Sequence, residues 1–207
     1  MNVLQEQVKK GVKILKAGGI VAFPTDTVYG LGADAFNSKA VERIYEVKNR
    51  PRHMSFPLLI SDLSQISTIA APASQVALFL AKHFWPGGLT LILLKTASLP
   101  TYLANQSTIA VRIPNHPIPL ALIQGLGRPI IGTSANISGK LNNLTIGKVK
   151  QQLGDKVDLI IDAGKCPNES ESTIVDVTGE MPAILRQGII PKHEIEKAYD
   201  EYCRSKG

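Results

Sequence analysis

Residues 18–32, with the sequence GGIVAFPTDTVYGLG, constrain the fold of this chain more than any other stretch. The apolar run from Ile20 to Phe23 predicts a short buried strand, which ends at Pro24 because proline lacks a backbone N–H. In open α/β sheets, ligands bind at the carboxyl ends of strands. The stretch therefore predicts either a ligand site or, more simply, a polar turn with local hydrogen bonds, built from Thr25, Asp26, Thr27 and Tyr29.

Glycines follow this polar cluster, and a second cluster resembles it. Gly30 and Gly32 let the backbone turn or come close to a ligand. Farther along, residues 129–131 predict another short buried strand, and residues 132–139 (GTSANISG) follow it with hydroxyl and amide side chains between glycines. Two predicted strands thus end in clusters that could contact a ligand.

The rest of the chain mixes helical and strand patterns without strict alternation. Apolar periodicity, caps and breakers predict helices, one of them with a preceding loop, over residues 2–17, 38–48, 61–69, 73–84, 117–124, 142–153 and 192–204. They predict strands over residues 20–23, 56–60, 89–94, 109–113, 129–131, 157–162, 172–177 and 184–186. The expected fold is a single α/β domain over residues 1–207, with a core at about 8–190, and with a mixed, twisted open β-sheet flanked by helices.

The composition narrows the classes of function. Of the 207 residues, 44% are apolar and 5% aromatic, and the net charge is +6. A basic excess favours partners that carry phosphates, whereas few aromatic residues leave little for base stacking. The two cysteines and four histidines are scattered, which predicts neither a disulfide framework nor a metal cage. Because no signal peptide or membrane-spanning run is evident, a cytoplasmic protein without membrane contact is expected.

Familiar catalytic motifs are absent or incomplete. The chain has no P-loop, and no G-x-G-x-x-G follows the first predicted strand. Ser134 lies in a stretch similar to the nucleophile elbow G-x-S-x-G, but Asn136 replaces the last glycine. A hydrolase would also need an acid and then a histidine downstream, where only His193 lies. An acyl hydrolase at Ser134 is therefore the lowest-ranked interpretation.

The remaining candidates are cations and neutral polar groups: Lys48, Arg50, Arg112 and Arg186, with Thr25, Thr27, Thr108, Ser134, Asn136 and Ser172. Phosphoryl and nucleotidyl transfer need positioning and charge neutralisation more than a side-chain nucleophile, and arginine forks also suit a carboxylate. Arg112, in an otherwise apolar strand, requires an acidic partner or a ligand. The residues predict binding of a nucleotide and a small carboxylate, with a nucleic-acid-binding module as the second interpretation.

Seven stretches together resemble the YrdC/Sua5 family, the threonylcarbamoyl-AMP synthases. The stretches are FPTDTVYGLG (23–32), KNRP (48–51), WPGGLT (85–90), VRIPNHP (111–117), TSANISG (133–139), STIVD (172–176) and ILRQG (184–188). They span nearly the whole chain in the order of the family. The chain resembles the short form, without the additional C-terminal domain of Sua5.

The resemblance implies an α/β fold with a large, positively charged concave face, and a nucleotidyltransferase. The implied reaction makes L-threonylcarbamoyl-AMP and pyrophosphate from L-threonine, bicarbonate and ATP, with magnesium bound through the ATP phosphates rather than by protein ligands. The product supplies the threonylcarbamoyl group of the modified adenosine at position 37 of tRNA, in a second step that a partner transferase complex performs. The resemblance also implies tRNA or double-stranded RNA as a partner.

The family's site residues carry over by motif. Thr27 is implied to hold L-threonine, and Arg112 to bind its carboxylate. The implied ATP-binding residues are Lys48, Arg50, Thr108, Ser134, Asn136, Ser172 and Arg186, and the implied catalytic residues are Lys48, Arg50, Ser134 and Asn136. Carboxylated threonine would attack the α-phosphate, while the cations and magnesium absorb the charge of the leaving pyrophosphate.

One stretch departs from the synthases. Residues 52–63 are more similar to the YciO branch of the family. Many synthases have a lysine or asparagine at the position of Met54 and a histidine at that of Leu59. The alternative function is therefore a YciO-like protein that binds nucleotide or RNA with weak or no synthase activity.

Overall fold

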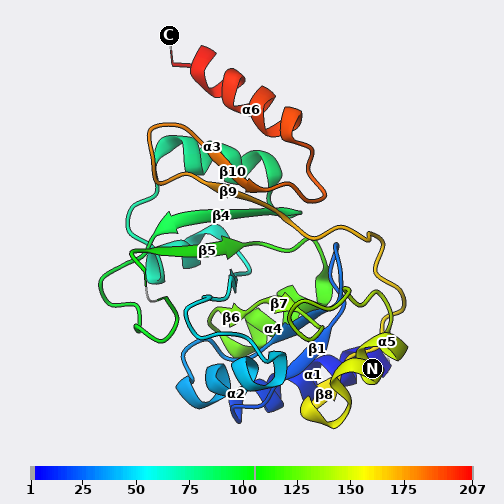
Figure 1. The fold of residues 1–207 in the computed structure, drawn as a ribbon. Helices are drawn as coiled ribbons and strands as arrows, with labels where there is room; N and C mark the ends of the chain where they lie inside the picture. Colours follow the sequence, from blue (N-terminus) through cyan, green and yellow to red (C-terminus); the bar gives the residue numbers. More distant parts are fainter. Residues whose placement is uncertain (1–2, 105, 207) are drawn as a thin grey trace.

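The computed structural model describes residues 3–104 and 106–206, and its strands form two sheets (Figure 1). The four-stranded sheet, in spatial order, consists of β7 (Thr133–Ser134), β2 (Gly30–Gly32), β1 (Val21–Phe23) and β8 (Leu159–Ile160). The six-stranded sheet consists of β10 (Ala183–Arg186), β9 (Thr173–Asp176), β4 (Leu89–Leu94), β5 (Thr108–Arg112), β3 (Leu58–Leu59) and β6 (Ile130–Ile131). Both sheets mix parallel and antiparallel pairs, which confirms the predicted fold class, although the strands divide into two sheets rather than one.

The chain passes from one sheet to the other at Gly132, between β6 and β7. β6 pairs with β3 in the larger sheet, while β7 pairs with β2 in the smaller one, where Gly30 lies opposite Ser134. A side chain has no room at the crossing, because a Cβ on Gly132 would lie 2.2 Å from Cγ of Leu59. The crossing brings the second polar cluster directly beside the first.

Strands β2 and β7 were not predicted. Gly30 and Gly32 were expected at a turn or a close approach to a ligand, but both belong to β2 and pair with β1. What they approach is the ring of Phe23, since a Cβ on Gly32 would lie 2.7 Å from its Cε1. The glycines are therefore needed for packing inside the sheet.

The helices begin and end mostly at local signals. They are α1 (Val3–Lys16), α2 (Ser38–Lys48), α3 (Gln75–Phe84), α4 (Pro117–Leu126), α5 (Ile146–Leu153) and α6 (Lys192–Arg204), with 3-10 segments η1 (Leu63–Thr68) and η2 (Gly154–Lys156). The Asn37 side chain accepts a hydrogen bond from the backbone N–H of Ala40 and so caps α2, which ends at Asn49 with φ 48°. The predicted bounds of α2, β4 and α6 are confirmed residue for residue.

Helix α4 is longer than predicted. Gly125 was expected to end this helix, but the helix continues to Leu126 and is capped by Gly127, where φ is +83°. Gly125 lies against α1, because a Cβ there would be 2.6 Å from Cγ2 of Val12. The glycine thus allows close packing of α4 against α1 and does not end the helix.

Apolar side chains form two buried clusters around the sheets. The larger includes Ile44 of α2, Leu80 of α3 and Leu91 of β4, and the smaller joins α1 and α4 to β1 through residues such as Leu15 and Phe23. Figure 1 shows α3 and α6 near the six-stranded sheet and α1, α2 and α5 toward the opposite end. Within residues 3–104 and 106–206, no helix has the length and apolar character that a membrane crossing requires.

The buried carboxylate of Asp34 provides a test of stability. Asp34 is 1% exposed, and its Oδ2 lies 2.5 Å from Nη2 of Arg128. We expect Arg128→Met to lower the free energy of unfolding by about 2 kcal/mol, because the buried charge loses its partner. The measurement is urea unfolding with Arg43→Met as the control, since Arg43 pairs with Asp158 at the surface and should cost less than about 1 kcal/mol. Equal losses in the two variants would contradict this account.

Candidate functional site

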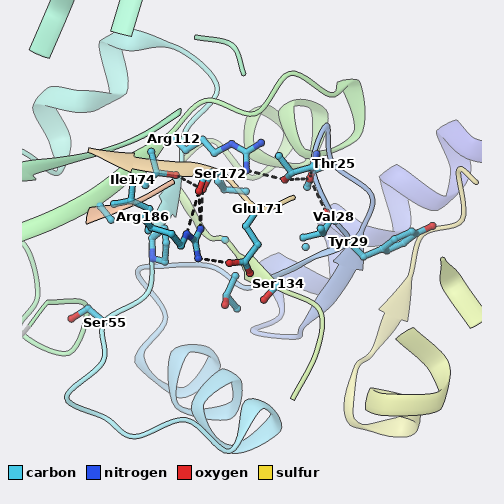
Figure 2. Close-up of a pocket in the computed structure, with 18 of the residues that line it drawn as sticks. Thr25, Val28, Tyr29, Ser55, Arg112, Ser134, Glu171, Ser172, Ile174 and Arg186 are labelled. Atoms are coloured by element: carbon cyan, nitrogen blue, oxygen red, sulfur yellow. Dashed lines mark hydrogen bonds and ion pairs between the residues drawn. The ribbon is translucent and has the colours of Figure 1, made fainter. Parts of the chain in front are cut away.

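A pocket of about 240 Å³ lies where the two sheets meet. Its lining includes Thr25 and Thr27 from the first polar cluster and Thr133 and Ser134 from the second. Figure 2 shows Arg112, Ser172 and Arg186 converging on the same space. The two clusters that the sequence analysis singled out thus form one site.

Arg112 lines this pocket, and each of its three side-chain nitrogens makes one contact, which leaves one N–H on each Nη for a ligand. Its Nη2 lies 2.7 Å from Oδ1 of Asp26, its Nη1 donates to Oγ1 of Thr27 at 3.1 Å, and its Nε donates to the carbonyl of Gly87 at 2.9 Å. Burial lowers the pKa of Arg112, while the charge of Asp26 opposes that fall. An acidic partner and a ligand were the two alternatives expected for Arg112. The guanidinium has the acidic partner, Asp26, and also lines the pocket.

The hydroxyl groups of Thr25 and Thr27 have a defined direction. Thr25 donates its hydrogen to the carbonyl of Val28 at 2.7 Å, so in its 3.0 Å contact with Thr27 it must accept. Thr27 consequently donates to Thr25 while it accepts from Arg112. Toward the pocket, Thr27 can offer a lone pair but no hydrogen, so it suits a ligand amine or hydroxyl.

Tyr29 contributes to the wall rather than to the chemistry. Figure 2 shows its ring directed away from Arg186, and its hydroxyl donates to the carbonyl of Gly164 at 3.0 Å. Burial raises the pKa of Tyr29 to about 12. The phenol therefore stays protonated and holds the loop around Gly164.

Lys48 lies behind the pocket wall and not among its lining residues. The side chain is 1% exposed, and Nζ donates to the carbonyl oxygens of Ser134 (2.6 Å) and Asn136 (2.7 Å) and to Oδ1 of Asn136 (3.2 Å). Burial, and secondarily the charge of Arg50, lowers the pKa of Lys48 to about 8. Because an ammonium has three hydrogens, none remains for a phosphate while these three bonds are made.

Asn136 is also buried, and it orients Ser134. Its Oδ1 accepts from the Ser134 hydroxyl at 2.6 Å, and its Nδ2 donates to the carbonyl of Lys140 at 2.6 Å. Ser134 lines the pocket, but its partner is an amide and not a base. His193 lies in a separate pocket between α3 and α6, which removes the basis for the acyl-hydrolase interpretation.

Thr108 lies outside the lining of the pocket. It begins β5 and pairs with Leu94. Residues two apart on a strand share a face, so Thr108 lies on the same face as Ala110 and Arg112, which do line the pocket. Its predicted contact with ATP could therefore be made only by a ligand that extends along this sheet face.

Two further guanidinium groups line the pocket, those of Arg50 and Arg186. Arg50 lies over the ring of Phe56, 4.9 Å from its centroid, and donates to the carbonyls of Met54 (2.9 Å) and Ser55 (3.0 Å). Burial lowers the pKa of Arg50. Arg186 contacts the backbone of Ser172 and the carboxylate of Glu171. The pair places two positive charges in the lining of the pocket.

Sequence reasoning missed Glu171, whose carboxylate lies inside the pocket (Figure 2). Its position directly before Ser172, a predicted site residue, was an available signal. It also missed Thr90, which donates to Oγ of Ser172 at 2.8 Å and so orients a predicted residue.

The two departures from the synthase pattern lie in different places. Met54 is 45% exposed and outside the lining, whereas Leu59 lines the pocket. Leu59 packs against Gly132 at the crossing between the sheets. An apolar side chain thus lies where the resemblance to the synthases implies an imidazole.

Comparisons with known proteins agree with this geometry. A family model named for Sua5, YciO and YrdC, and described as telomere recombination, matches residues 13–188. The threonylcarbamoyl-AMP synthase of Bacillus subtilis is 42% identical over 92% of this chain and 56% of its own. Sua5 of Pyrococcus abyssi, solved with L-threonine, superposes with a TM-score of 0.89 at 41% identity, over 92% of this chain and 56% of its own. YciO of Escherichia coli superposes with a TM-score of 0.82 at 33% identity, over 90% and 91%.

This chain covers different fractions of the lengths of these relatives. The chain spans about half the length of the synthase and of Sua5, but nearly the whole of YciO. The shared part contains the strands that build the pocket, since the family match runs from residue 13 to residue 188.

Proposed function

Because the chain belongs to the Sua5/YciO/YrdC family, we propose that it is a nucleotidyltransferase that makes L-threonylcarbamoyl-AMP and pyrophosphate from L-threonine, bicarbonate and ATP. One observation carries the proposal. A single pocket is lined at one place by Arg112 and Thr27, which suit an amino acid, and at another by Arg50 and Arg186, which suit phosphates. An amino acid and a triphosphate bound at these two places would face each other.

L-Threonine would bind at Arg112. A buried guanidinium attracts the carboxylate, and the lone pair of Thr27 accepts a hydrogen from the substrate amine or hydroxyl. The relative from Pyrococcus abyssi was solved with L-threonine, which supports this substrate. Ser134 and Ser172, which also line the pocket, would contact the reacting groups.

ATP would place its phosphates at Arg50 and Arg186. The amine of L-threonine condenses with bicarbonate to form a carbamate, with loss of water. An oxygen of this carbamate attacks the α-phosphorus, and the bond from that phosphorus to the bridging oxygen of pyrophosphate breaks. The negative charge grows on the leaving group, so fixed guanidinium groups nearby stabilise the transition state. Thr108 would contact the nucleoside end, which extends along its sheet face.

Lys48 and Asn136 would act as positioning residues. Neither lines the pocket, and both hold the segment that carries Ser134. Of the four predicted catalytic residues, Arg50 and Ser134 would therefore contact the substrates directly. Lys48 and Asn136 would hold Ser134 in position.

Magnesium would bind with the triphosphate. Within the described residues, no group of three or more His, Cys, Asp and Glu side chains could hold a metal ion. Magnesium at such sites is held largely by substrate phosphates and water, and the hydroxyl groups of the lining are compatible with that arrangement. When bound, it would neutralise charge on the pyrophosphate.

The product implies the further partners. A transferase complex would pass the threonylcarbamoyl group to adenosine 37 of tRNA, and we place the reaction in the cytoplasm. Binding of tRNA or double-stranded RNA to the basic chain, with net charge +6, belongs to the same proposal.

A second candidate is a YciO-like nucleotide-binding or RNA-binding protein with weak or no synthase activity. Two observations favour it: Leu59 in the lining and the match to YciO over 91% of that chain. It predicts binding of ATP without turnover.

The test is incubation of the chain with ATP, magnesium, labelled bicarbonate and L-threonine. The synthase proposal predicts pyrophosphate release and incorporation of label, both dependent on L-threonine. We expect Arg186→Gln to lower the rate on the order of 100-fold, because it removes a charge that stabilises the leaving group. Arg204→Gln, on the exposed end of α6, is the control and should leave the rate unchanged. ATP binding without threonine-dependent release would favour the YciO-like function instead.

A further inference from the structure

Glu171 has a place in the pocket that the proposed reaction does not use. Among the described lining residues, it alone carries a carboxylate. Figure 2 shows this carboxylate directed toward Arg186, with Ser134 nearby, and it forms an ion pair with Nη1 of Arg186. A negative group thus lies where the proposed function requires phosphate oxygens.

Arg186 does not depend on Glu171 for its orientation. Its Nε and Nη2 donate to the carbonyl of Ser172 at 3.2 and 3.0 Å, and Nη2 also lies 3.3 Å from Oγ of Ser172. The backbone of Ser172 therefore holds one side of the guanidinium. Nη1 remains for another anion, and Glu171 takes it.

The carboxylate can leave while its backbone stays. The carbonyl of Glu171 accepts from the backbone N–H of Ile189 at 2.9 Å, and Gly188 packs against it so closely that a Cβ would lie 2.2 Å from that oxygen. The side chain, in contrast, is 30% exposed, and that of Arg186 is 41% exposed. Rotation about the Glu171 side-chain bonds can therefore open the ion pair without moving the wall.

We propose that Glu171 competes with the phosphate groups of ATP and of pyrophosphate for Nη1 of Arg186, and that it thereby weakens the binding of both. The competition would favour release of pyrophosphate, because the carboxylate returns to Arg186 as the product leaves. L-Threonine, which binds at Arg112, would not be affected. The inference rests on the proposed placement of the triphosphate at Arg186.

The test is calorimetric binding of pyrophosphate, ATP and L-threonine to the full chain and to Glu171→Gln, with and without magnesium. Glutamine keeps the shape of the side chain but removes its charge. We expect pyrophosphate and ATP to bind about tenfold more tightly to Glu171→Gln without magnesium, because a nearby negative charge is lost, and L-threonine to bind as before. Inhibition by added pyrophosphate should strengthen by the same factor.

Glu169→Gln is the matched control, because it removes an equal charge from an exposed residue two positions away. It should bind all three ligands within about twofold of the original chain, since exposed charges are screened by salt. Equal or weaker binding of pyrophosphate by Glu171→Gln would overturn the inference while leaving the proposed function intact. If Glu171→Gln bound pyrophosphate and ATP more weakly only when magnesium is present, the inference would be overturned in favour of a metal-binding role for Glu171. Failure of the original chain to bind either phosphate ligand would overturn both proposals.

Discussion

Replacing Lys48 with methionine should abolish most of the activity, although this side chain never reaches the pocket. Methionine removes one hydrogen-bond donor from each of three oxygen atoms, which belong to Ser134 and Asn136. The wall that presents Ser134 should then shift, and a displacement of about 1 Å can cost about 100-fold in rate. We therefore expect kcat/KM for pyrophosphate release to fall about 100-fold or more. Lys39→Met, on the exposed side of the same helix, should change it little, and equal activity of the two variants would contradict the account.

Because of the Lys48 ammonium, we expect alkaline pH to have opposite effects on activity and on stability. Burial lowers the pKa of Lys48 from 10.5 to about 8. Between these two pH values the unfolded chain binds more protons at Lys48 than the folded chain does. The free energy of unfolding should therefore rise as the pH rises from about 8 to 10.5. This gain is lost again as the pH falls toward 8. Activity should instead decline above about pH 8, because the neutral amine can no longer donate to all three oxygens.

Two quantities are measured from pH 7 to pH 10: the rate of pyrophosphate release and the urea unfolding midpoint. The dependence of the midpoint on pH is then interpreted by proton linkage. In Lys48→Met the part of each dependence that arises from this group should be missing. A decline in activity that persists unchanged in Lys48→Met would assign the titration to another residue.

Substitution of Arg112 by lysine should separate amino-acid binding from nucleotide binding. The guanidinium contacts Asp26, Thr27 and the carbonyl of Gly87 through three different nitrogens. One ammonium cannot replace this planar fork. We expect the affinity for L-threonine to fall about 100-fold, as for loss of a charge-assisted, bidentate contact, while ATP affinity changes little.

Arg186→Lys is the reciprocal variant, since Arg186 lines the same pocket but contacts Ser172 and Glu171 rather than Asp26 and Thr27. It should weaken the binding of ATP and of pyrophosphate and leave the affinity for L-threonine unchanged. Calorimetry with each ligand separately measures these affinities for both variants. If Arg112→Lys weakened ATP more than L-threonine, the proposed orientation of the substrates would be reversed.

Much of the fold could be predicted because its signals are local. Helix α2 has its cap at Asn37 and its left-handed end at Asn49, both readable in the sequence. Strands β2 and β7 could not be predicted, because pairs such as Gly30 with Ser134 join residues far apart in the chain. Short strands of glycine, threonine and serine also lack the alternation of apolar residues that identifies a strand.

The site was predictable in its residue types more than in their roles. The motifs identified Arg112 and Thr27, which meet in the pocket. They did not distinguish Lys48 from the guanidinium groups, because only the fold decides which cation is buried behind the wall. Glu171 was missed because an acid in a polar loop usually faces solvent.

The central claim is that one pocket receives L-threonine at Arg112 and Thr27 and the triphosphate at Arg50 and Arg186. The most direct measurement is a crystal structure of the chain with L-threonine and a non-hydrolysable ATP analogue. The account predicts the amino-acid carboxylate at Arg112, the phosphates at Arg50 and Arg186, and the Glu171 side chain turned away from Nη1. Phosphates bound at Arg112, or both ligands bound outside the space between the two sheets, would contradict it.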